Sequence, residues 1–149
     1  MAADRLANTL FYSMEKAVKA YRQFAQQNLD RAGFDITIDQ WLVLKTLQDN
    51  PDTTLAQIGR DVFKDVASIT RIVQLLEKKG FVRRVANVTD KRRATLALTR
   101  LGKSTVKSLQ PVITANRTHA LTGLRAGDIK RSHEVFAAIT ANCQRGTPA

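Results

Sequence analysis

The sequence predicts a mainly helical protein with one small β-hairpin, arranged as a winged helix-turn-helix between long flanking helices. Three observations lead to this fold class. Apolar residues recur at helical spacing over most of the 149 residues. Two short segments, 81–85 and 94–98, are instead rich in β-branched residues or alternate with a period of two. The chain has one cysteine, so an apolar core and not a disulfide framework must hold it together.

The N-terminal part predicts three helices. Residues 5–29 carry apolar side chains at spacings of three and four, which is typical of an amphipathic helix. The next two helices should begin at capping boxes, in which a threonine is followed three residues later by a glutamine. These boxes are Thr37 with Gln40 and Thr54 with Gln57, and the turn "NPDT" lies between the two helices.

A fourth helix should begin after Asp65, a favourable N-cap, and end at Gly80, which suits the left-handed position beyond a helix end. The strands "FVRRV" and "ATLAL" follow, joined by the turn "ANVTDKR". Helical periodicity returns at Thr99 and continues through Leu124, although Pro111 should kink or break the helix. A last helix should carry a narrow apolar stripe over residues 129–143.

The basic charge of the chain is concentrated in one segment. The formal net charge is +11, and residues 60–103 hold twelve Lys and Arg against four Asp and Glu. The other residues together contribute only +3. A basic block within a folded segment is the electrostatic pattern of a nucleic-acid-binding surface, although a solvated basic face would have the same composition.

The predicted fourth helix has two contrasting faces. Ile72, Val73 and Leu76 lie within about 60° of Ile69 on a helical wheel and form the apolar face. In the major groove, arginine can form hydrogen bonds with guanine and glutamine with adenine, and methyl groups can contact the thymine methyl group. Serine and threonine hydroxyls can reach phosphates. The other face holds these residue types and no acid between 66 and 76, which indicates a recognition helix for the major groove; the alternative is a winged domain used for protein contacts. The expected DNA contacts on this helix are Ala67, Ser68, Thr70, Arg71, Gln74 and Lys78.

The segment "GFVRRVANVTDKRRATLALT" resembles the wing of the MarR family of bacterial transcription regulators, "G-L-V-x-R-x-x-x-x-x-D-x-R-x-x-x-x-x-L-T". Upstream, "SITRIVQLLEKKG" is similar to the recognition helix of that family. The order and length of the predicted elements fit the family over essentially the whole chain. The wing matches without a gap at Gly80, Val82, Arg84, Asp90, Arg92, Leu98 and Thr99.

The resemblance implies a role for the charged tip of the hairpin. In the family, the arginine at the position of Arg92 enters the minor groove, and the aspartate at the position of Asp90 holds that side chain. A lone exposed ion pair contributes about 0–1 kcal/mol, so Asp90 would act by positioning and not by stabilising the fold. An aspartate that caps its own turn is a compatible alternative. Lys91 and Arg93 would add phosphate contacts, and Arg84 belongs to the same expected surface.

The resemblance also implies a homodimer that binds a palindromic operator in double-stranded DNA. The whole chain, 1–149, would be one unit, with 37–99 as the DNA-binding lobe and with 5–29 and 100–144 as dimerisation helices. The sequence agrees, because the apolar stripes of the flanking helices exceed what a small lobe can cover. A two-fold symmetric dimer requires half-sites about one helical turn apart.

Many relatives release DNA when a small phenolic or other aromatic compound binds between the dimerisation helices and the lobe. The resemblance therefore predicts a ligand-released repressor, and the alternative is an architectural or protein-interaction winged-helix protein without an operator. Trp41 also fits the core, and His119 also fits a surface or an interface. The candidate ligand contacts are Tyr12, Tyr21, Trp41, Arg117 and His119.

Other function classes have little support in the sequence. No glycine-rich phosphate loop, metal-ligand cluster or paired nucleophile and base is present, so we expect no enzyme, cofactor or metal. Cys143 fits a packing position on the last apolar stripe, and a redox role is the alternative. No segment approaches the ~20 apolar residues of a membrane span, so we expect a soluble, cytoplasmic protein.

Overall fold

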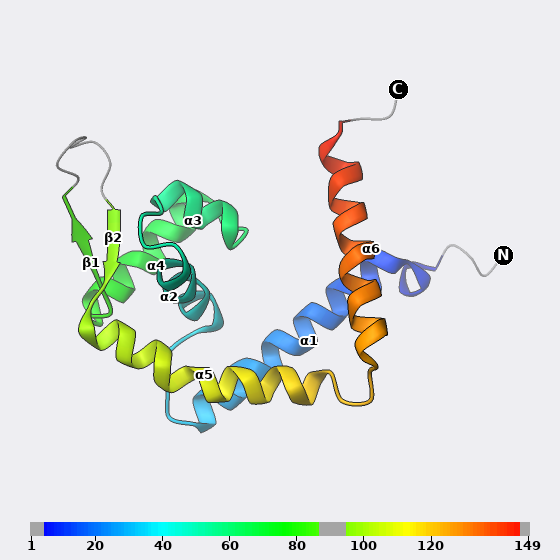
Figure 1. The fold of residues 1–149 in the computed structure, drawn as a ribbon, viewed down its shortest axis with the longest axis horizontal. Helices are drawn as coiled ribbons and strands as arrows, with labels where there is room; N and C mark the ends of the chain where they lie inside the picture. Colours follow the sequence, from blue (N-terminus) through cyan, green and yellow to red (C-terminus); the bar gives the residue numbers. More distant parts are fainter. Residues whose placement is uncertain (1–4, 87–94, 147–149) are drawn as a thin grey trace. The chain divides into compact units, whose positions relative to one another are not determined.

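The computed structural model describes residues 5–86 and 95–146 and confirms a mainly helical fold with one β-hairpin (Figure 1). The chain divides into two compact units, Met1–Asn116 and Arg117–Ala149, with the boundary inside the fifth α-helix. No helix in the described ranges is both long enough and apolar enough to cross a membrane. The elements, in chain order, are η2 (Leu6–Asn8), α1 (Leu10–Arg31), α2 (Ile38–Asp49), α3 (Leu55–Asp61), α4 (Val66–Lys78), β1 (Val82–Val85), β2 (Thr95–Leu98), α5 (Arg100–Ala120) and α6 (Ala126–Gln144).

One hydrophobic core joins the elements of the first unit. Its fully buried side chains include Leu29 of α1, Leu44 of α2, Ile58 of α3, Ile69 of α4 and Leu109 of α5. Figure 1 shows α2, α3 and α4 gathered beside the hairpin. Because each helix contributes an apolar face to the same core, the orientation of α4 is set by the whole lobe.

The two predicted capping boxes differ in the structure. At the start of α2 both bonds form: the Gln40 N–H donates to Thr37 Oγ1 (3.0 Å), and the Thr37 N–H donates to Gln40 Oε1 (3.2 Å). At the start of α3, the Gln57 N–H donates to Thr54 Oγ1 (3.2 Å), but the Gln57 amide donates to Asp61 instead of returning to the cap. The first box is therefore complete, and the second is half formed.

Helix α1 begins later than the apolar periodicity predicts. Thr9 has an extended backbone (φ −84°, ψ 143°), and its hydroxyl donates to the Leu6 carbonyl (2.8 Å). This bond stabilises the short turn η2 and separates it from α1, which starts at Leu10. The predicted start at residue 5 is wrong, because helical spacing of apolar residues does not reveal a local break in the backbone.

Helix α5 continues through Pro111, so the predicted alternative of a break at this residue is wrong. Proline removes the N–H that would bond to the carbonyl four residues earlier, on Lys107. Both residues are exposed, so water can reach that carbonyl, while Leu109 and Ile113 are buried on either side and hold the helix in the core. The helix ends at Ala120 and does not reach Leu124 as predicted.

The hairpin is antiparallel, with Val82 paired to Leu98 and Val85 paired to Thr95. Strand β1 is one residue shorter than predicted, at 82–85, and β2 is described over 95–98. Ala94, with which the second predicted strand begins, lies outside the described residues. An isolated bridge between Thr54 and Thr95 connects β2 to the segment that precedes α3. The wing is thus attached to the helix-turn-helix through the backbone as well as through the core.

The ends of the hairpin are held by a close contact with α5. A Cβ atom on Gly102 would lie 2.0 Å from the Phe81 carbonyl oxygen, so only glycine fits there. Thr99 caps α5: its hydroxyl accepts from the Gly102 N–H (3.0 Å) and donates to the Gly80 carbonyl (2.6 Å). These bonds connect the C-terminal end of α4 to the start of α5 and so position the wing beside α4.

Candidate nucleic-acid interface

Helix α4 is terminated at both ends as the sequence predicts. The Asp65 carboxylate accepts the Ser68 backbone N–H (2.7 Å) at its start. Hydrogen bonds from the Ser68 N–H and then from its hydroxyl lower the pKa of Asp65, so the carboxylate remains charged at the positive end of the helix. At its other end, Gly80 adopts φ +80°. The predicted apolar face is confirmed, since Ile69, Val73 and Leu76 are fully buried.

The predicted recognition face of α4 points to solvent. Ala67, Arg71, Gln74 and Lys78 are exposed, and Ser68 and Thr70 lie half-buried beside them. The side chains of Arg71, Gln74 and Lys78 form no hydrogen bond or ion pair with another described residue. Their donor groups are therefore available to a ligand.

Thr70 and Arg84 are already engaged within the protein. The Thr70 hydroxyl donates to the Val66 carbonyl (2.8 Å), which leaves its methyl group as the feature that DNA could contact. Arg84 Nε lies 3.0 Å from Glu77 Oε1, so this residue of β1 forms an ion pair with α4. Arg84 therefore helps to hold the wing against α4 in addition to carrying charge.

The charged tip of the wing lies outside the described residues. Asp90, Lys91, Arg92 and Arg93 belong to this segment, between Ala86 and Thr95. The strands that lead to the tip are described, and they are attached to α4 through Arg84 and to α5 through Thr99. The roles expected for the four residues stay predictions.

The turn between α3 and α4 contains a residue that the sequence analysis missed. Phe63 has a left-handed backbone (φ +60°), and its side chain is 93% exposed. The Lys64 N–H donates to the Gly59 carbonyl (2.9 Å), and the Phe63 N–H donates to the Arg60 carbonyl (3.3 Å). These are the two bonds of a Schellman motif, in which the residue at the position of Phe63 is usually glycine. A phenylalanine between a helix end and the next N-cap was the signal available in the sequence.

The same turn explains the glycine inside α3. A Cβ atom on Gly59 would lie 2.9 Å from the Lys64 carbonyl oxygen, which belongs to the backbone. The turn therefore packs directly on α3, and Val62 at its start is buried. As a result, Phe63 is held on a backbone that cannot easily rearrange.

The candidate effector residues fall into three environments. Tyr12 is exposed in the N-terminal half of α1, whereas Tyr21 packs against the core. Trp41 is only 5% exposed, which is the core position that its place on the apolar side of its helix favours over a ligand contact. Arg117 and His119 are exposed residues of the second unit.

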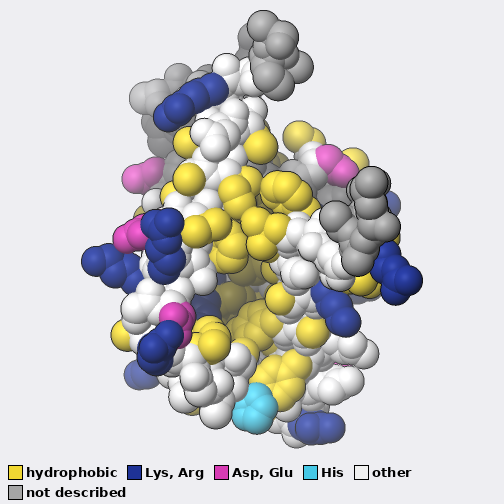
Figure 2. Space-filling model, turned by 90° about the vertical axis from the view of Figure 1, so that its right-hand side faces the viewer, with side chains coloured by type: hydrophobic (Ala, Val, Ile, Leu, Met, Phe, Trp, Pro, Cys, Tyr) yellow, Lys and Arg dark blue, Asp and Glu magenta, His cyan; other side chains and the backbone are white. Residues whose placement is uncertain are grey.

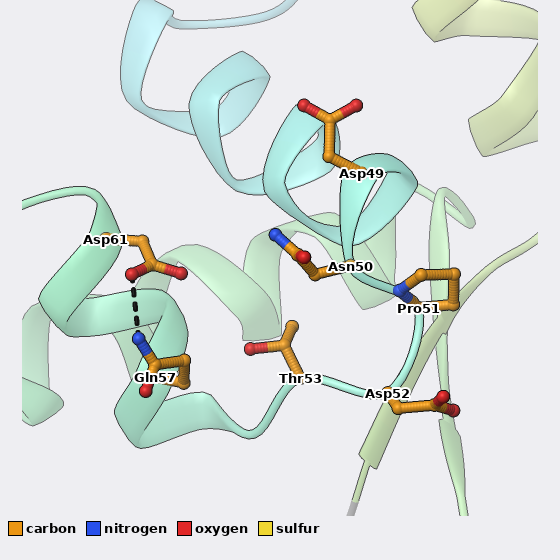
Figure 3. Close-up of a pocket in the computed structure, with 7 residues that line it drawn as sticks. All are labelled: Asp49, Asn50, Pro51, Asp52, Thr53, Gln57 and Asp61. Carbon is orange, nitrogen blue, oxygen red and sulfur yellow. Dashed lines mark hydrogen bonds between the residues drawn. The ribbon is translucent and has the colours of Figure 1, made fainter.

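A polar depression lies between the end of α2 and α3 (Figure 3). Asp61 accepts a hydrogen bond from Gln57 Nε2 (2.8 Å) at its edge. The carboxylates that line the depression would repel phosphate groups, so the depression is distinct from the basic surface of α4. Among the described residues, no group of three or more His, Cys, Asp or Glu could hold a metal ion. The depression is lined by Asp49, Asn50, Pro51, Asp52, Thr53, Gln57 and Asp61.

Helices α1 and α6 expose large apolar side chains along their apolar stripes. In the N-terminal half of α1, Leu10, Phe11 and Val18 are all more than half exposed. Helix α6 has no buried residue, and Phe136 in its predicted apolar stripe is 44% exposed. Figure 2 shows apolar side chains at the surface of the face it presents. Exposed apolar surface of this kind is available to a partner.

A short helix, a tight turn, an exposed recognition helix and an attached hairpin define the winged helix-turn-helix class of DNA-binding proteins. The family model described as "MarR family" matches residues 36–94. The regulator SarZ of Staphylococcus saprophyticus is 30% identical over 104 residues, which cover 69% of this chain and 67% of the relative. The chain therefore belongs to the MarR family of DNA-binding transcriptional regulators, and not to a family of enzymes.

Solved structures of other regulators share the fold. A mutant of Escherichia coli MarR complexed with operator DNA gives a TM-score of 0.79 at 21% identity, covering 87% of this chain and 92% of that chain. Bordetella bronchiseptica BpsR, studied for regulation of its DNA binding by 6-hydroxynicotinic acid, gives 0.81 at 16% identity, covering 94% and 96%. At these identities, the likeness establishes the fold alone.

Proposed function

We propose that this regulator recognises a specific palindromic operator as a homodimer and acts as a repressor that a small ligand releases. The observation that carries the proposal is the exposed face of α4, which presents Arg71, Gln74 and Lys78 with their polar groups unpaired among the described residues. A face evolved only for solvation would be expected to mix acids with these cations, and this one has no acid between 66 and 76.

On this proposal, α4 enters the major groove. Arg71 pairs with guanine and Gln74 with adenine, while the methyl groups of Ala67 and Thr70 contact thymine. Ser68 and Lys78 contact phosphates, which position the helix without specifying sequence. Because Thr70 uses its hydroxyl within the helix, its methyl group is the part assigned to DNA.

The wing adds a second contact on the same proposal. Arg92 enters the minor groove, Asp90 orients it, and Lys91 and Arg93 bind phosphates. Support comes from the attachment of the described strands: Arg84 pairs with Glu77 of α4 (3.0 Å), so a displacement of the wing would disturb the recognition helix. The two contacts would then bind adjacent grooves as one rigid element.

Homodimerisation is supported by the exposed apolar residues of α1 and α6, which a second copy could cover about a two-fold axis. Operator binding is supported by the shared fold of MarR in its complex with operator DNA. Ligand control is supported by BpsR, whose DNA binding is regulated by 6-hydroxynicotinic acid. The candidate contacts for an aromatic effector remain Tyr12, Tyr21 and Trp41 in the first unit and, taken separately, Arg117 and His119 in the second; the buried Trp41 must become accessible if it takes part.

The test is selection of random double-stranded DNA by the purified protein at near-physiological salt, followed by titration of the recovered duplex. We expect a two-fold symmetric motif. Arg71→Ala should weaken binding by about 1–3 kcal/mol and relax the preference at one position in each half-site, whereas Lys91→Ala should weaken binding to all sequences alike.

Equal losses for Arg71→Ala on selected and random duplexes would contradict its role as a base contact. Recovery of no motif, together with binding that falls steeply with salt, would instead favour the architectural winged-helix alternative. Transcription from a promoter that carries the motif, measured with and without the protein, then distinguishes a repressor from an activator.

A further inference from the structure

The α3–α4 turn exposes an aromatic ring beside the start of the recognition helix. Phe63 is 93% exposed, and Val66, the first residue of α4, is 64% exposed. We propose that these two side chains form an apolar contact with DNA in which the Phe63 ring packs against a thymine methyl group at the edge of the major groove. This proposal rests on the sequence-specific DNA binding proposed above.

The position of Phe63 in the chain favours DNA as the occupant of this surface. Phe63 lies two residues before Asp65, the N-cap of α4. In a helix-turn-helix, the N-terminal residues of the recognition helix contact the base edges, so the preceding turn lies close to the DNA. Phe63 and Val66 therefore immediately precede Ala67, the first residue of the exposed face of α4, in the chain.

The charges around the ring are consistent with DNA. Arg60 and Lys64 flank Phe63 and are both exposed. Arg60 donates to Gln57 Oε1 (2.7 Å) and Lys64 Nζ lies 3.3 Å from Asp39 Oδ2, so each would exchange an internal partner for a phosphate on binding. The neighbouring acids Asp61 and Asp65 accept hydrogen bonds from Gln57 Nε2 (2.8 Å) and the Ser68 N–H (2.7 Å), respectively, and keep their negative charge, which the two cations offset. The exposed apolar ring is therefore the feature of this turn that matches a thymine methyl group.

The backbone holds the ring away from the core. The left-handed conformation of Phe63 completes the Schellman motif, and the close approach of Lys64 to Gly59 leaves no room for the turn to shift toward α3. Glycine or asparagine would adopt this conformation with less strain. A strained phenylalanine that gains no burial in the protein is best explained by a contact made outside it.

The test compares Phe63→Asn and Phe63→Tyr with the wild type on the duplex recovered by selection. Asparagine tolerates the left-handed backbone and removes the ring, whereas tyrosine keeps both the ring and the strain. We expect Phe63→Asn to melt at the same or a higher temperature than the wild type and to bind the duplex about tenfold more weakly. Phe63→Tyr should bind within about twofold of the wild type, by the same argument from retained apolar area.

Replacing each thymine of the duplex by uracil removes one methyl group at a time and tests the contact from the DNA side. The wild type should lose about fourfold in affinity at one thymine per half-site, which is the effect expected for one buried methyl group. Phe63→Asn should show no loss at that thymine.

The outcomes separate this contact from the function on which it rests. If the wild type and Phe63→Asn bind the selected duplex equally well, the proposed role of Phe63 is overturned and operator binding is unaffected. The role of Phe63 is also overturned if Phe63→Asn sediments as a monomer where the wild type sediments as a dimer, and uracil has no effect on binding. That result would assign the ring to a contact between two copies of the chain. A selection that recovers no duplex overturns both proposals.

Discussion

Helices α4 and α6 are both amphipathic in sequence, yet their apolar stripes have different surroundings. In α4, Ile69, Val73 and Leu76 are fully buried in the core of the first unit. In α6 no residue is buried, and Phe136 is 44% exposed. Apolar periodicity therefore indicates that a helix face needs an apolar partner, but it does not tell whether that partner lies in the same chain.

The polar faces of the two helices differ as well. On α6, Arg131 pairs with Glu134 (3.2 Å), and at its start Arg125 pairs with Asp128 (3.0 Å). On α4, Arg71 and Lys78 have no acidic partner among the described residues. A helix face whose charges are paired with each other is typical of a solvent-exposed surface. A face with unpaired cations is better suited to binding a polyanion.

The largest effect should come from the buried stripe of α4. Ile69→Ala leaves a cavity in the core and should lower the free energy of unfolding by about 2–5 kcal/mol. Leu75→Ala, on the same helix but 44% exposed, should lower it by only about 1 kcal/mol or less. Chemical denaturation of the two variants measures the difference, and equal losses would show that the stripe is not the anchor of α4.

A different kind of effect should follow from the exposed stripe of α6. Phe136→Glu places a charge in the proposed contact between copies and should weaken dimerisation at least about tenfold, or ~1.4 kcal/mol. Ala138→Glu, an exposed position about 160° around the helix by the 100° spacing, is the matched control and should leave the dimer intact. Sedimentation over a range of protein concentrations measures both. If the two variants sediment alike, this stripe does not mediate the dimer.

The smallest effect concerns Asp39, which connects α1 to the turn before α4. It accepts from Arg22 and lies 3.3 Å from Lys64 Nζ. Partial burial raises the pKa of Asp39, but the hydrogen bond and charge of Arg22 and then those of Lys64 outweigh it, and the pKa falls below the ordinary 3.8. The stabilisation is therefore present above the unfolded value of 3.8 and is lost as the pH falls through the lower folded value.

Asp39→Asn tests this linkage. Since the pairs are partly exposed to solvent, the substitution should lower the free energy of unfolding by about 1 kcal/mol or less at pH 7. The difference from the wild type should shrink as the pH falls below 3.8. Urea denaturation at several pH values measures it, and a difference that does not change with pH would exclude the charge of Asp39 as its cause.

Local signals were the reliable ones in this sequence. The complete capping box at Thr37, the N-cap at Asp65 and the left-handed Gly80 all appear as predicted, because each depends on residues within one helical turn. The exposed and buried faces of α4 were predictable for the same reason. The ion pair of Arg84 with Glu77 was not, since it requires the strand to fold back onto the helix.

Which faces are apolar, where the positive charge is concentrated and where three of the helices begin can all be predicted from the sequence, because periodicity and capping act within a few residues. The folded structure was needed to establish that Gly102 packs against Phe81 and that α5 passes through Pro111 without a break. It also decided that Phe63 is held outward in a strained turn. These features depend on how closely separate segments approach in the folded core, and that distance is set by packing and not by local preference.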